Sequence, residues 1–420
     1  MRILFLTQII PFPPDSGPKV KTWHVLRYLL GQGHQVTLVS FVRSEEEQYI
    51  PALRDQGVEV IAVPMRRSRV KDVGYLLRSL VTGTSFLIER DNLPEFRRAV
   101  QDQLDRYPIE VVHADQLTMA QFATAKSGIT QPVRVFDAHN AVWTIVERMA
   151  ENLPRFLRPF AQIETRKVLD FEANTVRDFE HILAVSEPDR NALLSALGND
   201  ADRVTLAEKI TVIPIAVDTQ KLQMLRRQPL SKHIVTLGTL HYPPNADGIR
   251  WFINEVFPLV LAEEPGAHLT VIGKNPPADF LKNAQHDPEH VRVTGYVPDL
   301  DPVLGEAAIM VVPVRAGGGM RVRILEAFAR GIPLVTTTVG LEGINAWDGI
   351  EVIVRDDAAS FAQAVVALLR DPEAQEKLAL AGRRLAEERY DWQIALSALD
   401  QVYSGVQTRL DQVAQVGIQI

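Results

Sequence analysis

Short apolar runs alternate with helical patterns along almost the whole chain of 420 residues. In the first half these runs predict strands at 3–7, 36–41, 58–63, 109–113, 133–137, 181–185 and 211–213. In the second half they predict strands at 233–238, 268–273, 291–295, 308–313, 334–337 and 351–354. Strands that alternate with helices favour a parallel sheet covered on both faces. The pattern therefore predicts an α/β fold of two doubly wound, Rossmann-like domains that face each other across a cleft.

A polar stretch at 219–232 separates the two halves of the pattern. We expect a first domain at 1–220, a linker at 221–232, a second domain at 233–390 and a final segment at 391–420. Apolar residues recur at helical spacing along this final segment, so it predicts one long helix.

Composition narrows the class of protein. The chain is 46% hydrophobic and 23% charged, which is typical of a globular protein with an ample core. Its net charge of −7 argues against nucleic acid as the main partner. The absence of cysteine excludes disulfides, thiolate metal sites and cysteine nucleophiles. The apolar run at the N-terminus is too short for a signal peptide. No run of about 18 apolar residues occurs elsewhere in the sequence, so we expect a cytoplasmic protein.

The most informative segment is a glycine loop between an apolar run and a helical pattern. Three consecutive glycines, Gly317 to Gly319, allow a ligand to approach the backbone closely. The helix that follows directs free N–H groups and its positive dipole end at the loop, an arrangement that binds phosphate. Arg321 and Arg323 add positive charge, and Glu326 can accept hydrogen bonds from sugar hydroxyls. The loop therefore predicts a site for a diphosphate and a ribose.

Seven segments in order resemble those of the family 4 glycosyltransferases, which have the GT-B fold. They lie at 13–17, 137–140, 185–189, 212–218, 237–248, 293–299 and 317–326. The second, fifth and last are most similar to sugar transferases of bacterial polysaccharide gene clusters. The resemblance implies a retaining hexosyltransferase, without metal or cofactor, that moves a sugar from a UDP- or GDP-sugar to a glycan or lipid-linked acceptor. It also implies a C-terminal helix that crosses back to the first domain. A lipid-linked acceptor would bring a cytoplasmic protein into peripheral contact with the inner face of the plasma membrane.

The resemblance assigns residues as well. Glu326 matches the second Glu of a Glu-x7-Glu pattern that holds the ribose, whereas Gly318 replaces the first Glu. His139 matches a position near the reacting sugar, and Gly17 a glycine that touches the donor phosphate. The expected catalytic residues are His139, Arg321 and Glu326, and no metal ligand is expected. The expected donor-binding residues are Gly17, Gly238, Tyr296, Val297, Gly317, Gly318, Gly319, Met320, Arg321, Arg323 and Glu326.

Several of these residues have structural alternatives. Glu326 could pair with Arg330 or Arg323 on one helix face, since both lie at helical spacing from it. His139 could be a hydrogen-bonded core histidine. The basic segment with Arg66, Arg67 and Arg69 precedes a helical pattern with leucines at 76, 77 and 80. Such a helix can lie on anionic lipid, or it can pack its leucines inward.

Two other functions stay open beside sugar transfer. Nucleotide-sugar 2-epimerases share the fold and need no acceptor. A non-catalytic nucleotide-sugar-binding partner subunit is favoured by the glycine at position 318, where the family pattern has a glutamate.

Overall fold

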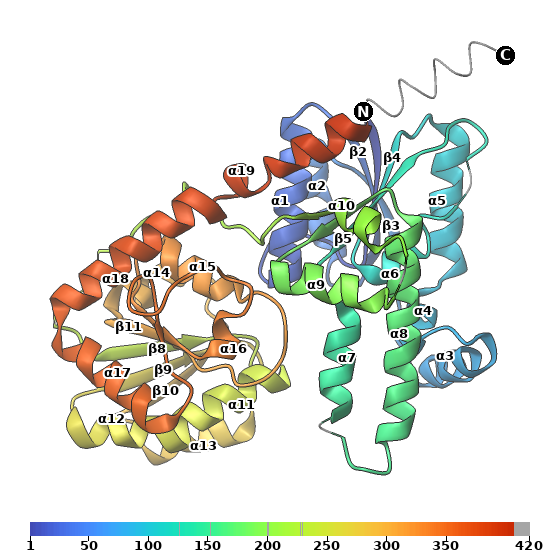
Figure 1. The fold of residues 1–420 in the computed structure, drawn as a ribbon. Coiled ribbons are helices and arrows are strands. Elements are labelled where there is room, and N and C mark those ends of the chain that lie inside the picture. The colour runs from blue at the N-terminus through green and yellow to red at the C-terminus, as the bar shows by residue number, and fades with distance from the viewer. Residues whose placement is uncertain (126, 152, 200, 227, 229, 407–420) are drawn as a thin grey trace. The chain divides into compact units, whose positions relative to one another are not determined.

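The computed structural model describes residues 1–406 except 126, 152, 200, 227 and 229. The chain divides into two compact units, both of the α/β class (Figure 1). The first unit holds Met1–Ile215 and the segment from Ala395 onward, and the second holds Ala216–Ile394. Positions 227 and 229 of the expected linker and 407–420 of the expected final helix lie outside the described residues.

The first unit is built on a seven-stranded parallel sheet of order β3-β2-β1-β4-β5-β6-β7. Its strands are β1 (Arg2–Thr7), β2 (Gln35–Val42), β3 (Glu59–Pro64), β4 (Val111–Asp115), β5 (Val133–Ala138), β6 (His181–Ala184) and β7 (Ile210–Val212). All seven predicted strands are confirmed. The largest difference is at β4, which begins and ends two residues later than predicted and so includes Asp115.

Helices cover both faces of this sheet. They are α1 (Gly17–Gly31), α2 (Ile50–Asp55), α3 (Arg69–Thr82), α4 (Phe86–Asp91), α5 (Pro94–Arg106), α6 (Leu117–Ala120), α7 (Val142–Glu151), α8 (Arg158–Asp178), α9 (Glu187–Ala196) and α10 (Arg203–Glu208), with a 3₁₀ turn, η1 (Glu47–Tyr49). Figure 1 shows α1 on one face and α5 on the other. Leu4 and Leu6 of β1 join Phe96 of α5 and Val168 of α8 in one buried cluster.

The second unit is built on a six-stranded parallel sheet of order β10-β9-β8-β11-β12-β13. Its strands are β8 (His233–Leu237), β9 (His268–Ile272), β10 (Val291–Gly295), β11 (Ile309–Val312), β12 (Leu334–Thr336) and β13 (Ile353–Val354). All six were predicted within two residues of their ends. Together the two sheets confirm the predicted pair of doubly wound parallel domains.

The helices of the second unit follow the same alternation. They are α11 (Pro243–Trp251), α12 (Phe257–Glu263), α13 (Ala278–His286), α14 (Asp301–Glu306), α15 (Val322–Ala329), α16 (Thr338–Leu341), α17 (Ala358–Arg370), α18 (Pro372–Leu385) and α19 (Trp392–Ala395), with π-helical turns η2 (Phe252–Val256) and η3 (Ala386–Tyr390). Proline lies in the first turn of α11, α12, α14 and α18, where its missing N–H leaves no helical bond unmade.

The segment expected to link the domains lies on the second unit. Leu225 donates its backbone N–H to Arg330 at 3.0 Å, and Met224 lies over Gly331. Arg383 of α18 donates to the carbonyl of Thr219 at 2.9 Å. These contacts explain why residues from 216 onward belong to the second unit.

The final segment is not one continuous helix, so that prediction is wrong. α19 ends at Ala395, a turn follows at 396–397, and a second helix is described at 398–406. The break coincides with the return of the chain to the first unit. There Tyr28 of α1 donates a hydrogen bond to Asp400 at 2.9 Å. Among the described helices, none has both the length and the hydropathy needed to cross a bilayer.

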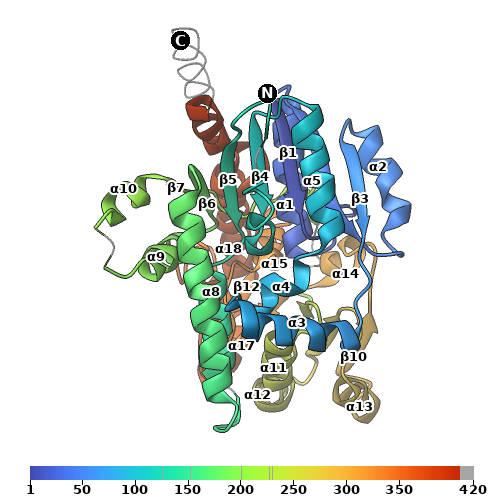
Figure 2. The same ribbon diagram turned by 90° about the vertical axis from the view of Figure 1, so that its right-hand side faces the viewer.

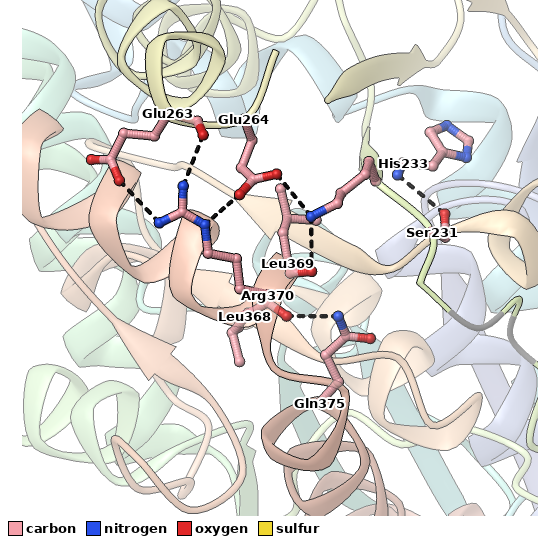
Figure 3. Close-up of polar contacts among 9 residues, drawn as sticks. Ser231, His233, Glu263, Glu264, Leu368, Leu369, Arg370 and Gln375 are labelled. Atoms are coloured by element: carbon pink, nitrogen blue, oxygen red, sulfur yellow. Dashed lines mark hydrogen bonds and ion pairs between the residues drawn. The ribbon is translucent and has the colours of Figure 1, made fainter. Parts of the chain in front are cut away.

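The amino ends of the second sheet are fastened by ion pairs and backbone contacts. Arg370 of α17 contacts both Glu263 and Glu264 at the end of α12, and Lys232 donates to Glu264 at 2.8 Å (Figure 3). Gln375 of α18 donates to the carbonyl of Leu368 at 2.6 Å. The candidate ligand-binding residues lie at the opposite edge of the same sheet, where the strands end.

Candidate functional site

In each unit the direction of the strand order reverses once. The reversal lies between β1 and β4 in the first sheet and between β8 and β11 in the second. In open α/β sheets, ligands bind outside the carboxyl ends of the strands at such a switch point. In the second unit Gly238 follows β8 directly, and the glycine loop follows β11. The two segments predicted to bind the donor therefore flank one switch point.

Arg323 of α15 spans this switch point. Its Nη1 donates to the carbonyl oxygen of Leu237 at 3.0 Å, and its Nη2 donates to the amide oxygen of Asn245 in α11 at 2.7 Å. Its Nε is buried and has no hydrogen-bond partner among the described residues. Burial, assisted by the nearby Arg321, lowers the pKa of Arg323. A partly buried cation whose hydrogen-bond partners are neutral gains free energy from an anionic ligand.

Gly238 permits this position of Arg323. A Cβ at residue 238 would lie 2.3 Å from Nη1 of Arg323 and 3.2 Å from the side-chain nitrogen of Asn245. Any larger side chain would therefore displace the guanidinium. The role of Gly238 in this structure is to allow the close approach of a charged side chain.

The glycine loop leaves backbone N–H groups available. Gly317 and Gly319 have φ of +99° and +84°, which favour glycine. Nη1 of Arg321 donates to the carbonyl oxygens of Gly318, at 2.6 Å, and Gly319, and so folds back over the loop. In the described part of the chain, the N–H groups of residues 318–320 donate no hydrogen bond. Successive free N–H groups at the start of a helix suit an anion.

Glu326 lies one turn further along α15 on the partly buried side. Neither of the two alternative helical pairs of Glu326 forms, because Arg330 pairs with Asp301 at 2.7 Å and Arg323 bonds to neutral groups. Within the described residues Glu326 makes no ion pair. Burial raises the pKa of Glu326, although Arg330 and Arg323 act in the opposite direction. The carboxyl group is therefore available to a polar ligand.

Tyr296 and Val297 follow β10, two strands away from β8. Tyr296 is 53% exposed, and Nζ of Lys274 lies 4.2 Å from its ring centre. Lys274 follows β9 and so lies at the same edge of the sheet, between these residues and Gly238. Sequence reasoning missed this lysine. A basic residue placed directly after a predicted strand and glycine was the available signal.

The first unit carries a buried ionic cluster at its own switch point. Lys21 of α1 contacts the carboxylate of Asp137, the second to last residue of β5. His113 of β4 lies 3.4 Å from the other oxygen of Asp137 and 2.8 Å from the hydroxyl of Tyr403. Burial opposes ionisation of Asp137, but Lys21 and His113 outweigh it and hold its pKa below the ordinary value. This carboxylate is therefore ionised and paired.

His139 belongs to the same cluster. Its Nε2 lies 2.6 Å from Asp115, the last residue of β4. Asp115 also accepts hydrogen bonds from the hydroxyls of Thr7 at 2.7 Å and Thr22 at 2.9 Å. His139 is thus a hydrogen-bonded histidine at a strand end, and only 8% of it is exposed. Its predicted role near the reacting sugar stays a prediction.

Three members of the cluster have the spacing of metal ligands. Among the described residues, Asp115, Asp137 and His139 offer atoms that lie within 4.8 Å of one another. An ammonium group from Lys21 already neutralises Asp137, and two hydroxyls already bond to Asp115. Asp137 therefore has a cationic partner within the chain, whereas the two threonine donors to Asp115 are neutral.

Sequence reasoning missed Lys21 and Asp115. Lys21 reads as a polar position of an ordinary helix, and its partner Asp137 lies 116 positions away in the sequence. Asp115 lay two residues beyond the predicted end of its strand. Gly17, predicted to touch the donor phosphate, is the first residue of α1 in the first unit, whereas the glycine loop belongs to the second.

A cavity of about 210 Å³ opens beside this cluster, within the first unit. It is lined by Gln8, Arg67, Leu87, Ile88, Arg90, Asp91, Gln116, Leu117, Thr118, Val142 and Val168. Gln116 has a φ of +78°, which is strained for a residue with a side chain. In the described structure, the side-chain nitrogen of Gln116 and the hydroxyl of Thr118 are buried without a partner. These two groups can bond to a polar ligand in the cavity.

Known proteins resemble the chain over most of its length. The glycosyl transferase 4-like domain matches residues 16–208, and the glycosyl transferases group 1 domain matches residues 231–371. A 44.6 kDa protein of the cps region of Klebsiella pneumoniae is 25% identical over 173 residues, which is 40% of this chain and 45% of that protein. A phosphatidyl-myo-inositol mannosyltransferase of Mycobacterium leprae is 27% identical over 234 residues, 54% of this chain and 59% of that protein. The matches thus span about half the length of these relatives.

A solved structure has the same fold. Anabaena Alr3699/HepE in complex with UDP superimposes with a TM-score of 0.69 at 14% identity, covering 96% of this chain and 100% of that chain. At this identity the likeness concerns the fold alone. The two domain matches together cover the glycine loop, Arg323, Glu326 and the cluster around His139. The chain belongs to the group 1 glycosyltransferases and has the GT-B fold.

Proposed function

We propose that this protein transfers a sugar from a nucleoside diphosphosugar to a glycan or lipid-linked acceptor, with retention of configuration and without a metal ion. One observation carries the proposal: a partly buried guanidinium with neutral hydrogen-bond partners lies at one switch point, beside a glycine loop whose N–H groups at 318–320 donate no hydrogen bond within the described structure. Because the chain belongs to a family of glycosyltransferases, we assign this anion site to sugar transfer. The relatives include a cps-region protein and an enzyme named for a lipid acceptor, which supports a glycan or lipid-linked acceptor.

The second unit is assigned to the donor. Residues 318–320 and Arg323 would hold the diphosphate, and Glu326 would accept hydrogen bonds from the ribose. The backbone at Tyr296 and Val297 would meet the base, and Lys274 supplies a further positive charge between them. A diphosphate would then meet the buried cation through short charge-assisted hydrogen bonds.

The proposed chemistry is electrostatic. The bond from the anomeric carbon to the diphosphate breaks, and the nucleoside diphosphate leaves with the bonding electrons. The acceptor oxygen attacks from the same side and gives its proton to a phosphate oxygen. Fixed N–H groups and Arg323 stabilise the charge that grows on the leaving group, which is a large contribution in comparable sites. Arg321 would assist after release from the loop carbonyls, and His139 would orient the transferred sugar.

The cavity of the first unit is assigned to the acceptor. Its polar groups without partners, on Gln116 and Thr118, suit hydroxyls, and Arg67 and Arg90 suit a nearby phosphate. Arg67 already pairs with Asp91 at 2.5 Å, so the cavity holds a fixed charge pattern before any ligand enters. Pocket variants such as Thr118→Val should weaken acceptor binding more than donor binding.

The test is a turnover assay with matched donors and acceptors. UDP- and GDP-sugars are incubated with polyprenyl-phosphate-linked or oligosaccharide acceptors, with and without EDTA. We expect release of nucleoside diphosphate that requires an acceptor and survives EDTA, with a product whose anomeric configuration, read by NMR, is that of the donor. Arg323→Gln should lower this rate by about 10²–10³, the usual effect of removing one such donor group.

The alternatives give different results in the same assay. Formation of an epimer from donor alone would identify a 2-epimerase. Tight calorimetric binding of UDP or GDP, with no turnover across the acceptors, would identify a non-catalytic subunit. Inhibition by EDTA would contradict the proposed metal independence and direct attention to the group formed by Asp115, Asp137 and His139.

A further inference from the structure

Helix α3 turns its apolar side to solvent. Its exposed apolar side chains are Val70, Val73, Leu76, Leu77, Leu80 and Val81. Their spacing places them on one side of the helix, and their exposed fractions run from 49% at Leu76 to 87% at Val81. Surface helices ordinarily direct this stripe at the core. The alternative in which the three leucines pack inward is therefore wrong for this structure.

Polar side chains hold α3 on the protein instead. Asp72 pairs with Arg90 of α4 at 3.0 Å, and Arg78 pairs with Glu89 at 3.0 Å. Ser79 is the one residue of α3 described as buried, and its carbonyl accepts a hydrogen bond from Nζ of Lys167 in α8 at 2.7 Å. The helix is thus anchored through its polar side, so the outward direction of its apolar side is fixed.

A second exposed apolar group lies on the neighbouring helices α7 and α8 and on the segment that joins them. It consists of Met149, Leu153, Phe156, Leu157, Phe160 and Ile163. Figure 1 shows α7 and α8 extending side by side away from the sheet, with α3 beside α8, and Figure 2 shows α3 next to α8 from the side. The hydroxyl of Ser85, just after α3, donates to Glu164 of α8 at 2.5 Å. We call these two groups together the apolar face.

The apolar face is the main concentration of exposed apolar residues described. It holds 12 of the 25 large hydrophobic side chains that are exposed in the described structure, including Phe156 at 74% and Phe160 at 71%. Apolar groups of this size on a soluble surface mark a binding partner. Scattered single residues would need no such explanation.

Positive charge surrounds the apolar face although the chain as a whole is acidic. Residues 65–81 carry five basic residues and one acidic residue, against a net charge of −7 for the protein. Two of the five, Arg67 and Arg78, already pair with Asp91 and Glu89. Arg66 is exposed just before α3, Lys71 is exposed in its first turn, and Arg155 is exposed between α7 and α8. Apolar side chains flanked by basic ones match the interface of an anionic bilayer, where acyl chains lie beneath negative headgroups.

We propose that the apolar face docks the first unit on an anionic lipid surface. The described helices include none that could cross a bilayer, so this contact is interfacial. Two apolar segments and a basic border act together, which matters because a single weak anchor gives only marginal binding. The proposal goes beyond sugar transfer, and its test requires neither a sugar donor nor an acceptor.

Vesicle flotation of the full chain tests it. Vesicles of phosphatidylcholine alone are compared with vesicles that also contain phosphatidylglycerol, at low and high salt. We expect binding only to the anionic vesicles, abolished by Leu77→Glu with Leu80→Glu and weakened by Phe156→Ala with Phe160→Ala. Arg66→Gln and Lys71→Gln should each weaken binding about fivefold and reduce its salt dependence.

A matched control separates this face from general surface hydrophobicity. Leu281→Glu with Leu380→Glu changes two leucines of the second unit that are 43% and 47% exposed, and should leave flotation unchanged. The proposal is overturned if the wild type does not float, if it floats equally with neutral vesicles, or if the control pair loses binding as well. It is also overturned if light scattering shows a dimer that Leu77→Glu with Leu80→Glu dissociates, because a second copy then covers the face.

The two proposals fail in distinguishable ways. Flotation needs no nucleotide, and nucleotide binding measured by calorimetry needs no lipid. Loss of flotation in the α3 variants with unchanged UDP affinity would support lipid docking and leave the donor site untouched.

Discussion

In the first unit, the charges at the carboxyl edge of the sheet are paired with one another, whereas the second unit keeps a partly buried guanidinium whose hydrogen-bond partners are neutral. Lys21 neutralises Asp137, and His139 and two threonines satisfy Asp115. At the corresponding edge of the second sheet, Arg323 bonds to a carbonyl and an amide and leaves its Nε without a partner.

The difference indicates two kinds of switch point built on the same topology. In the first unit the charges of the cluster are paired before any ligand arrives, although Oδ2 of Asp137 and Nε2 of His113 make no hydrogen bond in the described structure. This pairing fixes the orientation of groups such as His139. A partly buried cation without an ionic partner costs folding free energy, and binding of an anion offsets this cost. Removing a charge should therefore reduce stability in the first unit and reduce ligand affinity in the second.

The largest expected effect comes from Lys21→Met. It leaves Asp137 buried without its ammonium partner, and breaking such a pair typically costs about 3–5 kcal/mol. Urea denaturation measures the loss. Because the pKa of Asp137 should rise once Lys21 is gone, the folded state would take up a proton more readily than before. The deficit should accordingly be smaller at pH 5 than at pH 8.

The control is Lys377→Met, in α18 of the second unit. Lys377 pairs with Glu373 at 2.8 Å, and both side chains are largely exposed, where such pairs contribute little to stability. Equal losses of unfolding free energy in the two variants would show that the cluster around Asp137 contributes no more to stability than a surface ion pair.

Arg323→Gln tests the other side of the comparison. We expect nucleotide binding to weaken by about 1.5–3 kcal/mol, the usual contribution of a hydrogen bond to a charged group. Stability should change by about 1 kcal/mol or less, because the variant also removes a buried charge. Calorimetry with UDP and GDP measures the first effect and urea denaturation the second. Arg292→Gln, on an exposed position of β10, serves as control. A large loss of stability with intact affinity would reverse the assignment of roles.

Gly238→Ala displaces the same guanidinium without changing Arg323 itself. The new Cβ would lie 2.3 Å from Nη1 of Arg323, and the flexible end of the arginine must move. We expect nucleotide binding to weaken by about 1 kcal/mol, the lower end for a small group forced into a filled space. Gly266→Ala, where nothing lies within 4 Å of the added Cβ, should bind nucleotide as the wild type does. Indistinguishable affinities for both alanine variants would mean that the position of Arg323 is not critical.

The strands could be predicted from the sequence, but the paired cluster could not. Buried parallel strands read as apolar runs, and every one of the predicted strands was found. The glycine loop was also readable, because three glycines before a helix have few structural uses. Lys21 was not readable, since nothing local to α1 reveals a carboxylate on β5. The orientation of α3 was equally open, because a helical pattern gives the two sides of a helix but not which one meets the protein.

Tyr403→Phe gives the smallest expected effect and asks whether the returning segment belongs to the first unit's network. The variant removes the hydroxyl that lies 2.8 Å from Nδ1 of His113, so we expect a loss of about 0.5–1.5 kcal/mol of stability in urea. Tyr107→Phe, at a 40% exposed tyrosine, should change stability by no more than about 0.5 kcal/mol. Nucleotide affinity should be unchanged in both variants. If Tyr403→Phe instead weakened nucleotide binding at constant stability, charge pairing in the first unit would influence the ligand site of the second, and the separation of roles would fail.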